Sequence, residues 1–398
     1  MKKEPVKKET DKKTDKNTDN QTQSKRSAVP HILWGLLLIS AVAAEVAARM
    51  VPGFATWYTR NIYRVLVATW GGLVGLLPWS FAEFSILSMI MGLFVYALYN
   101  LGMVIKKERK FTLGVTSWFA LLARFLVTCF VIFVFGCGIN YYSVTFAESA
   151  GYDGKGCTEA ELRSAIIYMV DQVNANVDQI SFDEKGASIA PKGYMKDCIV
   201  AMQGVADNYG VTSSYVPQAK PLLFSRFFSI QLVSGIYLPT IEANFNREQT
   251  GEELGFTVCH EMSHLSGYMQ EEEANMISYL ACSGSDSAYL RYSGAMLALT
   301  YLTNAYKGKD ESELLKQLDP RATQDMYCTW EHWEQFKKPV ATVGDHEIVV
   351  SEIHTQINNA YLKANGDEDG VKSYGVMVNL LVEHLRKEGK LNVMLIED

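Results

Sequence analysis

Three long apolar segments near the start of this 398-residue chain constrain its fold more than any other feature. They cover residues 30–50, 84–105 and 115–141, and each is long enough to cross the hydrocarbon core of a bilayer as a helix. A helix satisfies its own backbone hydrogen bonds and can therefore cross lipid. We thus expect an N-terminal α-helical membrane region with three spans.

A fourth apolar segment, residues 60–81, is rich in Gly and Trp and is interrupted by Pro78. The basic N-terminal tail and Lys106–Lys110 both indicate a cytoplasmic side. An even number of crossings must separate them, so we predict that 60–81 is interfacial or re-entrant on the outer face. The alternative, a fourth span, would place the C-terminal part in the cytoplasm.

Composition divides the chain into three parts. Residues 1–28 are polar and highly charged, and we predict a disordered basic cytoplasmic tail. Residues 29–145 form the membrane region, and residues 146–398 are predicted to be an extracytoplasmic domain of a multi-pass cell-membrane protein.

The charge and the cysteines exclude several classes of function. The whole chain carries a net charge of −7 although its first parts are basic, so the C-terminal part is strongly acidic. This acidic balance argues against nucleic acid as a partner, because binding to phosphates needs a basic face. The apolar spans predict the lipid bilayer as one partner. The seven cysteines form no CxxC pair and indicate neither a disulfide scaffold nor a cysteine-zinc site. Cys157 and Cys198 could pair outside the cell, but free thiols are the simpler interpretation.

The acidic part is predicted to be mostly helical with few strands. Thr158 and Glu161 form a capping-box pattern at the start of a helix over residues 158–180. Residues 235–246 alternate as a β-strand, and Pro239 is typical of an edge strand, to which a peptide substrate can add. Glu242 on this strand is a candidate ligand, but the favoured interpretation is a surface or substrate-side carboxylate.

The segment after this strand holds two of the seven histidines within five residues. Thr250 with Glu253 is a second capping-box pattern and Gly267 is a stop signal, so a helix is predicted between them. On a helix, His260 and His264 leave the same face, and their spacing allows both imidazoles to bind one zinc ion.

Glu261 follows His260 directly and completes the pattern H-E-x-x-H. It points away from the ligand pair, so it can reach water on the metal without binding the metal itself. A catalytic zinc site needs a third protein ligand and an open position. Glu271, Glu272 and Glu273 are the candidates, and the residues alone leave the choice among them open.

The sequence EEEAN, residues 271–275, resembles the pattern E-x-x-A-D/N of gluzincin-type metallopeptidases. In those enzymes the third ligand is a glutamate at the first position, on a helix that follows the H-E-x-x-H helix. The resemblance implies that Glu271 is the third ligand. It also implies that Asn275 hydrogen-bonds a ligand histidine.

The stretches SGIYLPTIEANFN, HEMSHLSGYMQEEEANMISYLAC, RYSG and YLKANGDEDGVKSYG also resemble an uncharacterised bacterial family of multi-pass membrane proteins, a domain of unknown function. In that family the spans precede one extracytoplasmic peptidase-like domain. The resemblance implies a mainly α, α+β zincin-like domain with one zinc ion per chain. It supplies no substrate.

Resemblance and chemistry together imply a membrane-anchored zinc metalloendopeptidase acting on a peptide or protein substrate. Zinc-activated water would attack the amide, with Glu261 as the general base. Another group must stabilise the oxyanion. Tyr292 and Tyr374 are candidates, followed by His346 and His354.

Three alternatives remain open. The first is a non-catalytic membrane sensor or scaffold that retains a peptidase fold, although the intact Glu261 argues against it. The second is a cytoplasm-facing peptidase for quality control of membrane proteins. The third, an intramembrane protease, is disfavoured because the polar stretch NREQTGEELGF precedes the histidine pair.

Overall fold

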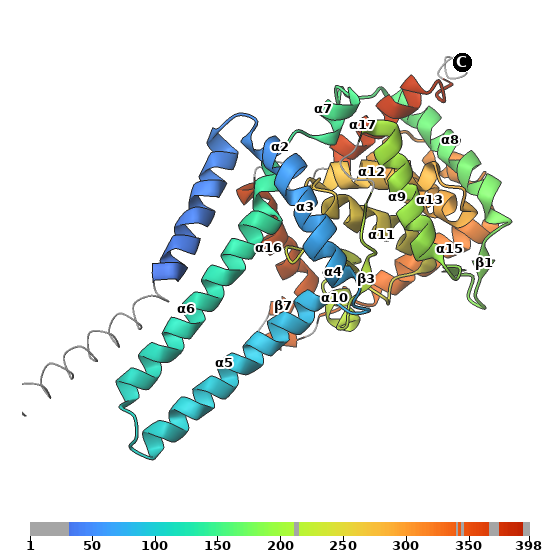
Figure 1. The fold of residues 1–398 in the computed structure, drawn as a ribbon. Helices are drawn as coiled ribbons and strands as arrows, with labels where there is room; N and C mark the ends of the chain where they lie inside the picture. Colours follow the sequence, from blue (N-terminus) through green and yellow to red (C-terminus); the bar gives the residue numbers. More distant parts are fainter. Residues whose placement is uncertain (1–31, 211–214, 340, 344–345, 366–373, 393–398) are drawn as a thin grey trace, which may run out of the picture. The chain divides into compact units, whose positions relative to one another are not determined.

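The computed structural model describes residues 32–210, 215–339, 341–343, 346–365 and 374–392. The protein is mainly helical, with a few short strands (Figure 1). Three helical stretches are long and apolar enough to cross a membrane: Ile32–Met50, Phe81–Ile105 and Phe111–Tyr142. The prediction of three membrane-spanning segments by length and composition is therefore confirmed.

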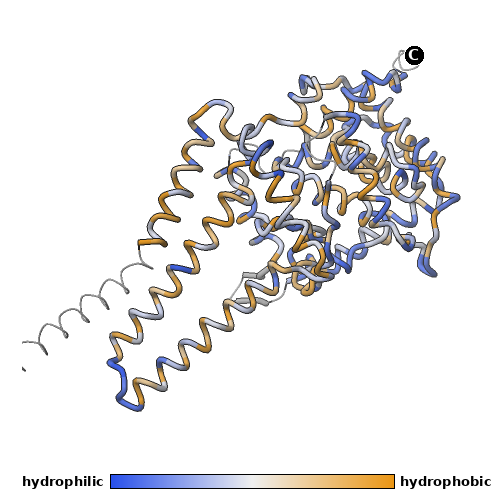
Figure 2. The backbone as a smooth tube through the Cα atoms, in the orientation of Figure 1, coloured by the Kyte–Doolittle hydropathy of each residue, from blue (hydrophilic) through white to orange (hydrophobic). Residues whose placement is uncertain are grey.

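The chain forms two compact units. The first unit contains the N-terminal helix up to Ala47 and residues Met89–Phe135, which belong to α5 (Phe81–Ile105) and α6 (Phe111–Gly136). Within it, the indole nitrogen of Trp118 donates a hydrogen bond to the Leu93 carbonyl at 3.1 Å. Figure 2 shows that both helices are largely apolar and that the turn between them is hydrophilic.

The second unit contains Ala48–Ser88 and the chain from Gly136 onward. Helix α11 packs against α9, α12 and α13, and α13 also packs against α8. From Gly136 onward, the described helices of this unit are η3 (Gly138–Tyr142), α7 (Phe146–Ala150), α8 (Glu159–Val177), α9 (Tyr194–Tyr209), α10 (Ser225–Ser229), α11 (Gly251–Leu265), α12 (Glu271–Ser283), α13 (Ala288–Ala305), α14 (Glu311–Leu315), α15 (Pro320–Glu334), α16 (Val350–Ala364) and α17 (Tyr374–Lys387).

The two predicted capping boxes have different outcomes. At the start of α8, Thr158 and Glu161 form the reciprocal pair of hydrogen bonds that the pattern predicts. Helix α11 also begins directly after Thr250, but the capping box predicted there was wrong. The Thr250 hydroxyl bonds the Thr329 hydroxyl at 2.8 Å, and the Trp333 indole donates to Glu253 at 2.7 Å. Contacts with α15 therefore take both side chains away from the helix terminus.

A three-stranded sheet lies beside α11, in the order β3–β5–β4. Its strands are β3 (Lys220–Pro221), β4 (Gly235–Leu238) and β5 (Glu242–Phe245), with β4 and β5 antiparallel and β3 and β5 parallel. The single strand predicted over 235–246 is therefore a hairpin, and Pro239 lies in its turn. Two further pairs are β1 (Ser181–Phe182) with β2 (Ser188–Ile189) and β6 (Ala341–Val343) with β7 (His346–Ile348).

Glu242 is buried, so its interpretation as a surface or substrate-side carboxylate was wrong. It forms an ion pair with Lys220, whose side chain is also buried. Its carboxylate also accepts hydrogen bonds from the backbone nitrogens of Phe81 and Ala82, both at 2.9 Å. The first N–H groups of a helix have no partner within the helix. Glu242 supplies that partner and so ties the start of α5 to the sheet.

The segment from Phe54 to Gly75 is helical and alternates between α- and π-type turns. It consists of α2 (Phe54–Tyr58), η1 (Thr59–Tyr63), α3 (Arg64–Leu66), η2 (Val67–Gly71) and α4 (Gly72–Gly75). The Trp70 indole donates to the Thr240 carbonyl at 3.0 Å, and Gly71 packs against Ile241 in the hairpin turn. Most of the segment predicted to be interfacial is thus a helix that rests on the sheet, within the same compact unit.

Candidate metal centre

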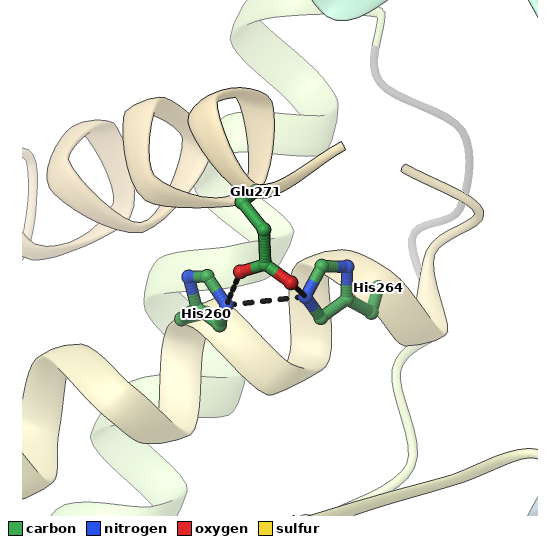
Figure 3. Close-up of side chains that lie close together, drawn as sticks. All are labelled: His260, His264 and Glu271. Atoms are coloured by element: carbon green, nitrogen blue, oxygen red, sulfur yellow. Dashed lines mark hydrogen bonds and ion pairs between the residues drawn. The ribbon is translucent and has the colours of Figure 1, made fainter. Parts of the chain in front are cut away.

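Helices α11 and α12 bring three ligand-type side chains together (Figure 3). The Nε2 atoms of His260 and His264 are 3.1 Å apart. One carboxylate oxygen of Glu271 lies 3.2 Å from His260 Nε2, and the other lies 3.8 Å from His264 Nε2. One ligand atom from each residue lies within 4.8 Å of the other two, which is close enough for all three to hold one metal ion.

Both histidines are oriented by hydrogen bonds at their other ring nitrogen. His264 Nδ1 lies 2.7 Å from the Tyr268 carbonyl, which can only accept, so Nδ1 donates. His260 Nδ1 lies 2.8 Å from the amide oxygen of Asn275. When both imidazoles are neutral, each Nε2 presents its lone pair to the cluster, which is the arrangement of metal-binding histidines. Asn275 therefore occupies the position that the resemblance implied for it.

The geometry distinguishes among the three adjacent glutamates. Glu271 is the member of the cluster, and it stands in the first turn of α12. The buried Glu273 instead accepts a hydrogen bond from the Ala147 backbone nitrogen at 3.2 Å and so holds α7. Gly267, with a positive φ, lies in the turn that returns the chain from α11 to α12. The structure thus groups Glu271, and neither neighbour, with the histidines.

Glu261 lies against the sheet and has an available oxygen. Its side chain is buried, and among the described residues its Oε2 atom has no hydrogen-bond partner. A buried polar atom without a partner is uncommon and is often functional. Gly235, the first residue of β4, sits so close that a Cβ atom there would collide with Glu261 and Thr257. The absence of a side chain at position 235 is therefore what gives this carboxylate its room.

Burial and mutual charge set the protonation of the four groups in the protein alone. Burial by itself lowers the pKa of His260, but the hydrogen bond and charge of Glu271 outweigh it and raise that pKa to about 9. Burial by itself raises the pKa of Glu271, but the two histidines lower it to about 2. Burial lowers the pKa of His264 to about 4 and raises that of Glu261 to about 8. In the protein alone, the proton on His260 thus balances the negative charge of the Glu271 carboxylate. Binding of a metal ion to these ligands releases that proton.

The structure does not bring Tyr292 to the cluster. This tyrosine is completely buried, and its hydroxyl donates to Asp325 at 2.9 Å. Asp325 also accepts from the Ser188 backbone nitrogen, so the hydroxyl belongs to a structural contact between α13, α15 and β2. His354 is half-buried in α16. The side chains of Tyr374 and His346 lie outside the described residues.

Tyrosines from other segments lie near the cluster, and sequence reasoning missed them. The ring of Tyr237 in β4 lies 6.3 Å from the ring of His264. The Tyr141 carbonyl accepts a hydrogen bond from Gln270, the residue before Glu271. The hydroxyl groups of Tyr361 and Tyr141 are 3.2 Å apart. No local pattern marks these residues, because Tyr141 and Tyr361 stand more than a hundred positions apart.

The donor set fits a catalytic zinc ion. Two imidazole nitrogens and one carboxylate oxygen are one of the ligand sets of such sites, which keep a fourth position open. The orientation of both imidazoles agrees with this use, as does the Glu261 oxygen that has no partner among the described residues. The donor set alone does not distinguish zinc from every other divalent metal ion.

Fold and site together define a mainly helical protein with three helices able to cross a membrane and a cluster of metal-ligand residues in its second unit. The family model described as "Protein of unknown function (DUF3810)" matches residues 58–382. The chain belongs to this family. No match was found among the curated proteins or among the solved structures.

Proposed function

We propose that this protein is a membrane-anchored zinc metallopeptidase that hydrolyses peptide bonds. The observation that carries the proposal is the convergence of His260, His264 and Glu271 beside the buried Glu261, whose Oε2 has no partner among the described residues.

Each residue has a defined task in this proposal. Zinc, when bound by His260, His264 and Glu271, supplies a Lewis acid that activates water and polarises a carbonyl group. Glu261 accepts a proton on Oε2 and returns it to the leaving nitrogen. Asn275 holds the imidazole of His260 in its orientation, and Gly235 keeps a side chain from filling the space at Glu261.

We also propose an orientation for the protein. Positive residues mark the cytoplasmic side of membrane proteins, and Lys106–Lys110 joins the second and third candidate spans. The third span then leads out of the cytoplasm, and the metal centre that follows it lies outside. A cysteine introduced at the exposed Lys309 tests this, with the wild-type chain as the control for native cysteines. Labelling of Lys309→Cys from outside intact cells supports the orientation, and protection from that reagent contradicts it.

The experiment that tests the function is metal analysis of the purified full-length protein. The full chain is required because Ala48–Ser88 belongs to the same compact unit as the site. We expect about one zinc ion per wild-type chain and a loss of that zinc in His264→Ala and Glu271→Ala. Lys309→Ala, remote from the cluster in sequence and exposed, should keep it. A wild-type protein that binds no zinc when zinc is supplied would leave the scaffold alternative instead.

Catalysis requires a second measurement. Wild-type protein should cleave an unfolded protein such as casein in the presence of zinc, and Glu261→Gln should bind zinc without cleaving. Equal cleavage by wild type and Glu261→Gln would indicate a contaminating protease.

A further inference from the structure

Residues next to the proposed metal ligands contact residues at the end of a candidate membrane span. The span Phe111–Tyr142 ends in residues that belong to the second unit. Of these, Cys137 Sγ lies 3.7 Å from the sulfur of Met269, and the Tyr141 carbonyl accepts a hydrogen bond from the Gln270 side chain at 2.9 Å. Gln270 directly precedes Glu271. The third proposed ligand is thus one residue away from a contact with the end of a span.

The sheet beside the site is attached to the same membrane-proximal residues. Tyr237 in β4 donates a hydrogen bond to the Gly136 carbonyl at 2.6 Å. Gly136 lies so close to the Pro239 carbonyl that a Cβ atom would collide with it. Strand β4 therefore runs from Gly235, which touches Glu261, to a turn that touches the end of the third span. Its four residues cover about 13 Å.

The segment between the first two spans adds a third attachment. The hydroxyl of Tyr63 bonds the Tyr237 hydroxyl at 2.8 Å and the Leu265 carbonyl at the end of α11. The same segment exposes large apolar side chains to the surroundings, among them Trp57, Val65, Leu73 and Leu76.

The occupant of this apolar face is best identified as the lipid bilayer. The helix follows the candidate span Ile32–Met50 and precedes the candidate span Phe81–Ile105. Only a few residues connect it to either one, and an extended chain covers at most about 3.6 Å per residue. Both of its ends must therefore stay near the membrane, where an apolar face is covered by lipid and not by water.

We propose that the metal centre acts on polypeptide that emerges from the membrane, such as the segment next to a membrane-spanning helix of another protein. β4 is an edge strand, and among the described residues it pairs with β5 alone. A substrate strand adds to this edge by main-chain hydrogen bonds. Its membrane end lies at the Pro239 turn, and its scissile bond lies at Gly235, about four residues from the bilayer. This inference rests on the proposed function and names its substrate class.

A cross-linking experiment tests the substrate class without requiring turnover. Full-length Glu261→Gln protein in phosphatidylcholine nanodiscs receives one unstructured peptide with a photo-reactive diazirine at its centre. The peptide is presented in three forms: joined to a phospholipid through about four residues, joined through about 24 residues, or without lipid. Cross-links to residues 235–238 are measured by mass spectrometry at equal bulk peptide concentration.

The proposal expects the short-tether peptide to label β4 about tenfold more than the lipid-free peptide, with the long tether in between. The long tether is the control for simple concentration at the bilayer, because both tethered forms share that effect. Equal labelling by the lipid-free peptide would overturn the proposal. Failure of every peptide to label β4 would overturn it as well.

A second measurement separates this inference from the proposed function. Cobalt is supplied to full-length protein in nanodiscs, its content is measured, and the broadening of the lipid phosphorus signal by the paramagnetic ion is recorded. We expect bound cobalt and a broadened signal in wild type, and neither in His264→Ala. Wild type without cobalt would contradict the metal centre itself. Bound cobalt without broadening would leave the metal centre standing and overturn only its location at the membrane surface.

Discussion

Helix α11 carries buried acidic groups at both ends, and the two ends are built differently. At the N-terminal end, Glu252 accepts a hydrogen bond from the Thr329 hydroxyl, and Glu253 accepts one from the Trp333 indole, both at 2.7 Å. At the C-terminal end, Glu261 is as buried as Glu252, but its Oε2 has no partner among the described residues. The same helix therefore holds acids with structural partners and one acid without them.

The difference indicates which carboxylate is available for chemistry. Burying an ionisable group is costly unless it is paired or protonated. Hydrogen bonds from α15 to Glu252 and Glu253 offset this cost at the N-terminal end. A helix N-terminus also favours negative charge. Glu261 has no such partner among the described residues, and its burial cost is met by protonation, since its pKa is raised to about 8. Four substitutions test this contrast.

The largest effect is expected at Glu261. Glu261→Gln should lower peptide hydrolysis about 10²–10⁴-fold with little change in zinc content, because it removes the proton acceptor and leaves the ligands intact. Glu252→Gln is the matched control at the other end of α11 and should retain hydrolysis. Comparable losses in both variants would mean that the two ends do not differ in function.

The next effect concerns the orientation of His260. Asn275→Ala removes the acceptor of its Nδ1 hydrogen bond and should weaken zinc affinity about 10–100-fold. Competition with a chelator measures this affinity in the full-length protein. Asn304→Ala, at an exposed position of α13, provides the control. An unchanged affinity in Asn275→Ala would show that the histidine needs no such partner.

A smaller effect is expected at the N-terminal end. Tyr292→Phe leaves the buried Asp325 without one donor and should cost about 1–3 kcal/mol of stability, with zinc binding and hydrolysis retained. Thermal unfolding of the detergent-solubilised chain measures it, and Tyr327→Phe at an exposed position of α15 is the control. Lost hydrolysis with unchanged stability would return Tyr292 to a catalytic role.

The smallest effect is a dependence on pH. Burial, with the charge of Asp325, raises the pKa of Glu253 from 4.5 to about 7. A raised pKa means that the folded state favours the protonated form, so this contribution to stability is complete below about pH 4.5 and is lost as the pH rises through about 7. Glu253→Gln should therefore gain stability relative to wild type between pH 5 and pH 8. Parallel unfolding curves for both proteins across that range would contradict the assignment.

Local patterns in the sequence were sufficient to predict which three side chains would lie together. His260, His264 and Glu271 lie within twelve positions, and helical spacing with one turn between helices brings them together. The spans were predictable as well, because length and composition define them. The choice of Glu271 over its neighbours needed the resemblance, since all three glutamates begin the same helix.

Contacts between distant positions could not be predicted. The hairpin turn at Pro239–Ile241 lacks the Asn-Gly or Gly signals of common turns, and Ile241 adopts a positive φ, which is unfavourable for a β-branched residue. Glu242 was assigned to the surface because its partners, Phe81 and Ala82, lie about 160 positions earlier. Tyr292 was placed at the site because nothing in its own segment reveals Asp325.

The hydrogen bonds from Phe81 and Ala82 to Glu242 have a consequence for biogenesis. During synthesis the start of α5 leaves the ribosome long before β5, so it is already in place when the sheet forms. Lys220 and Glu242 then meet a helix terminus that already exists. The sheet beside the candidate metal centre is therefore completed against the start of a helix that was synthesised about 160 residues earlier.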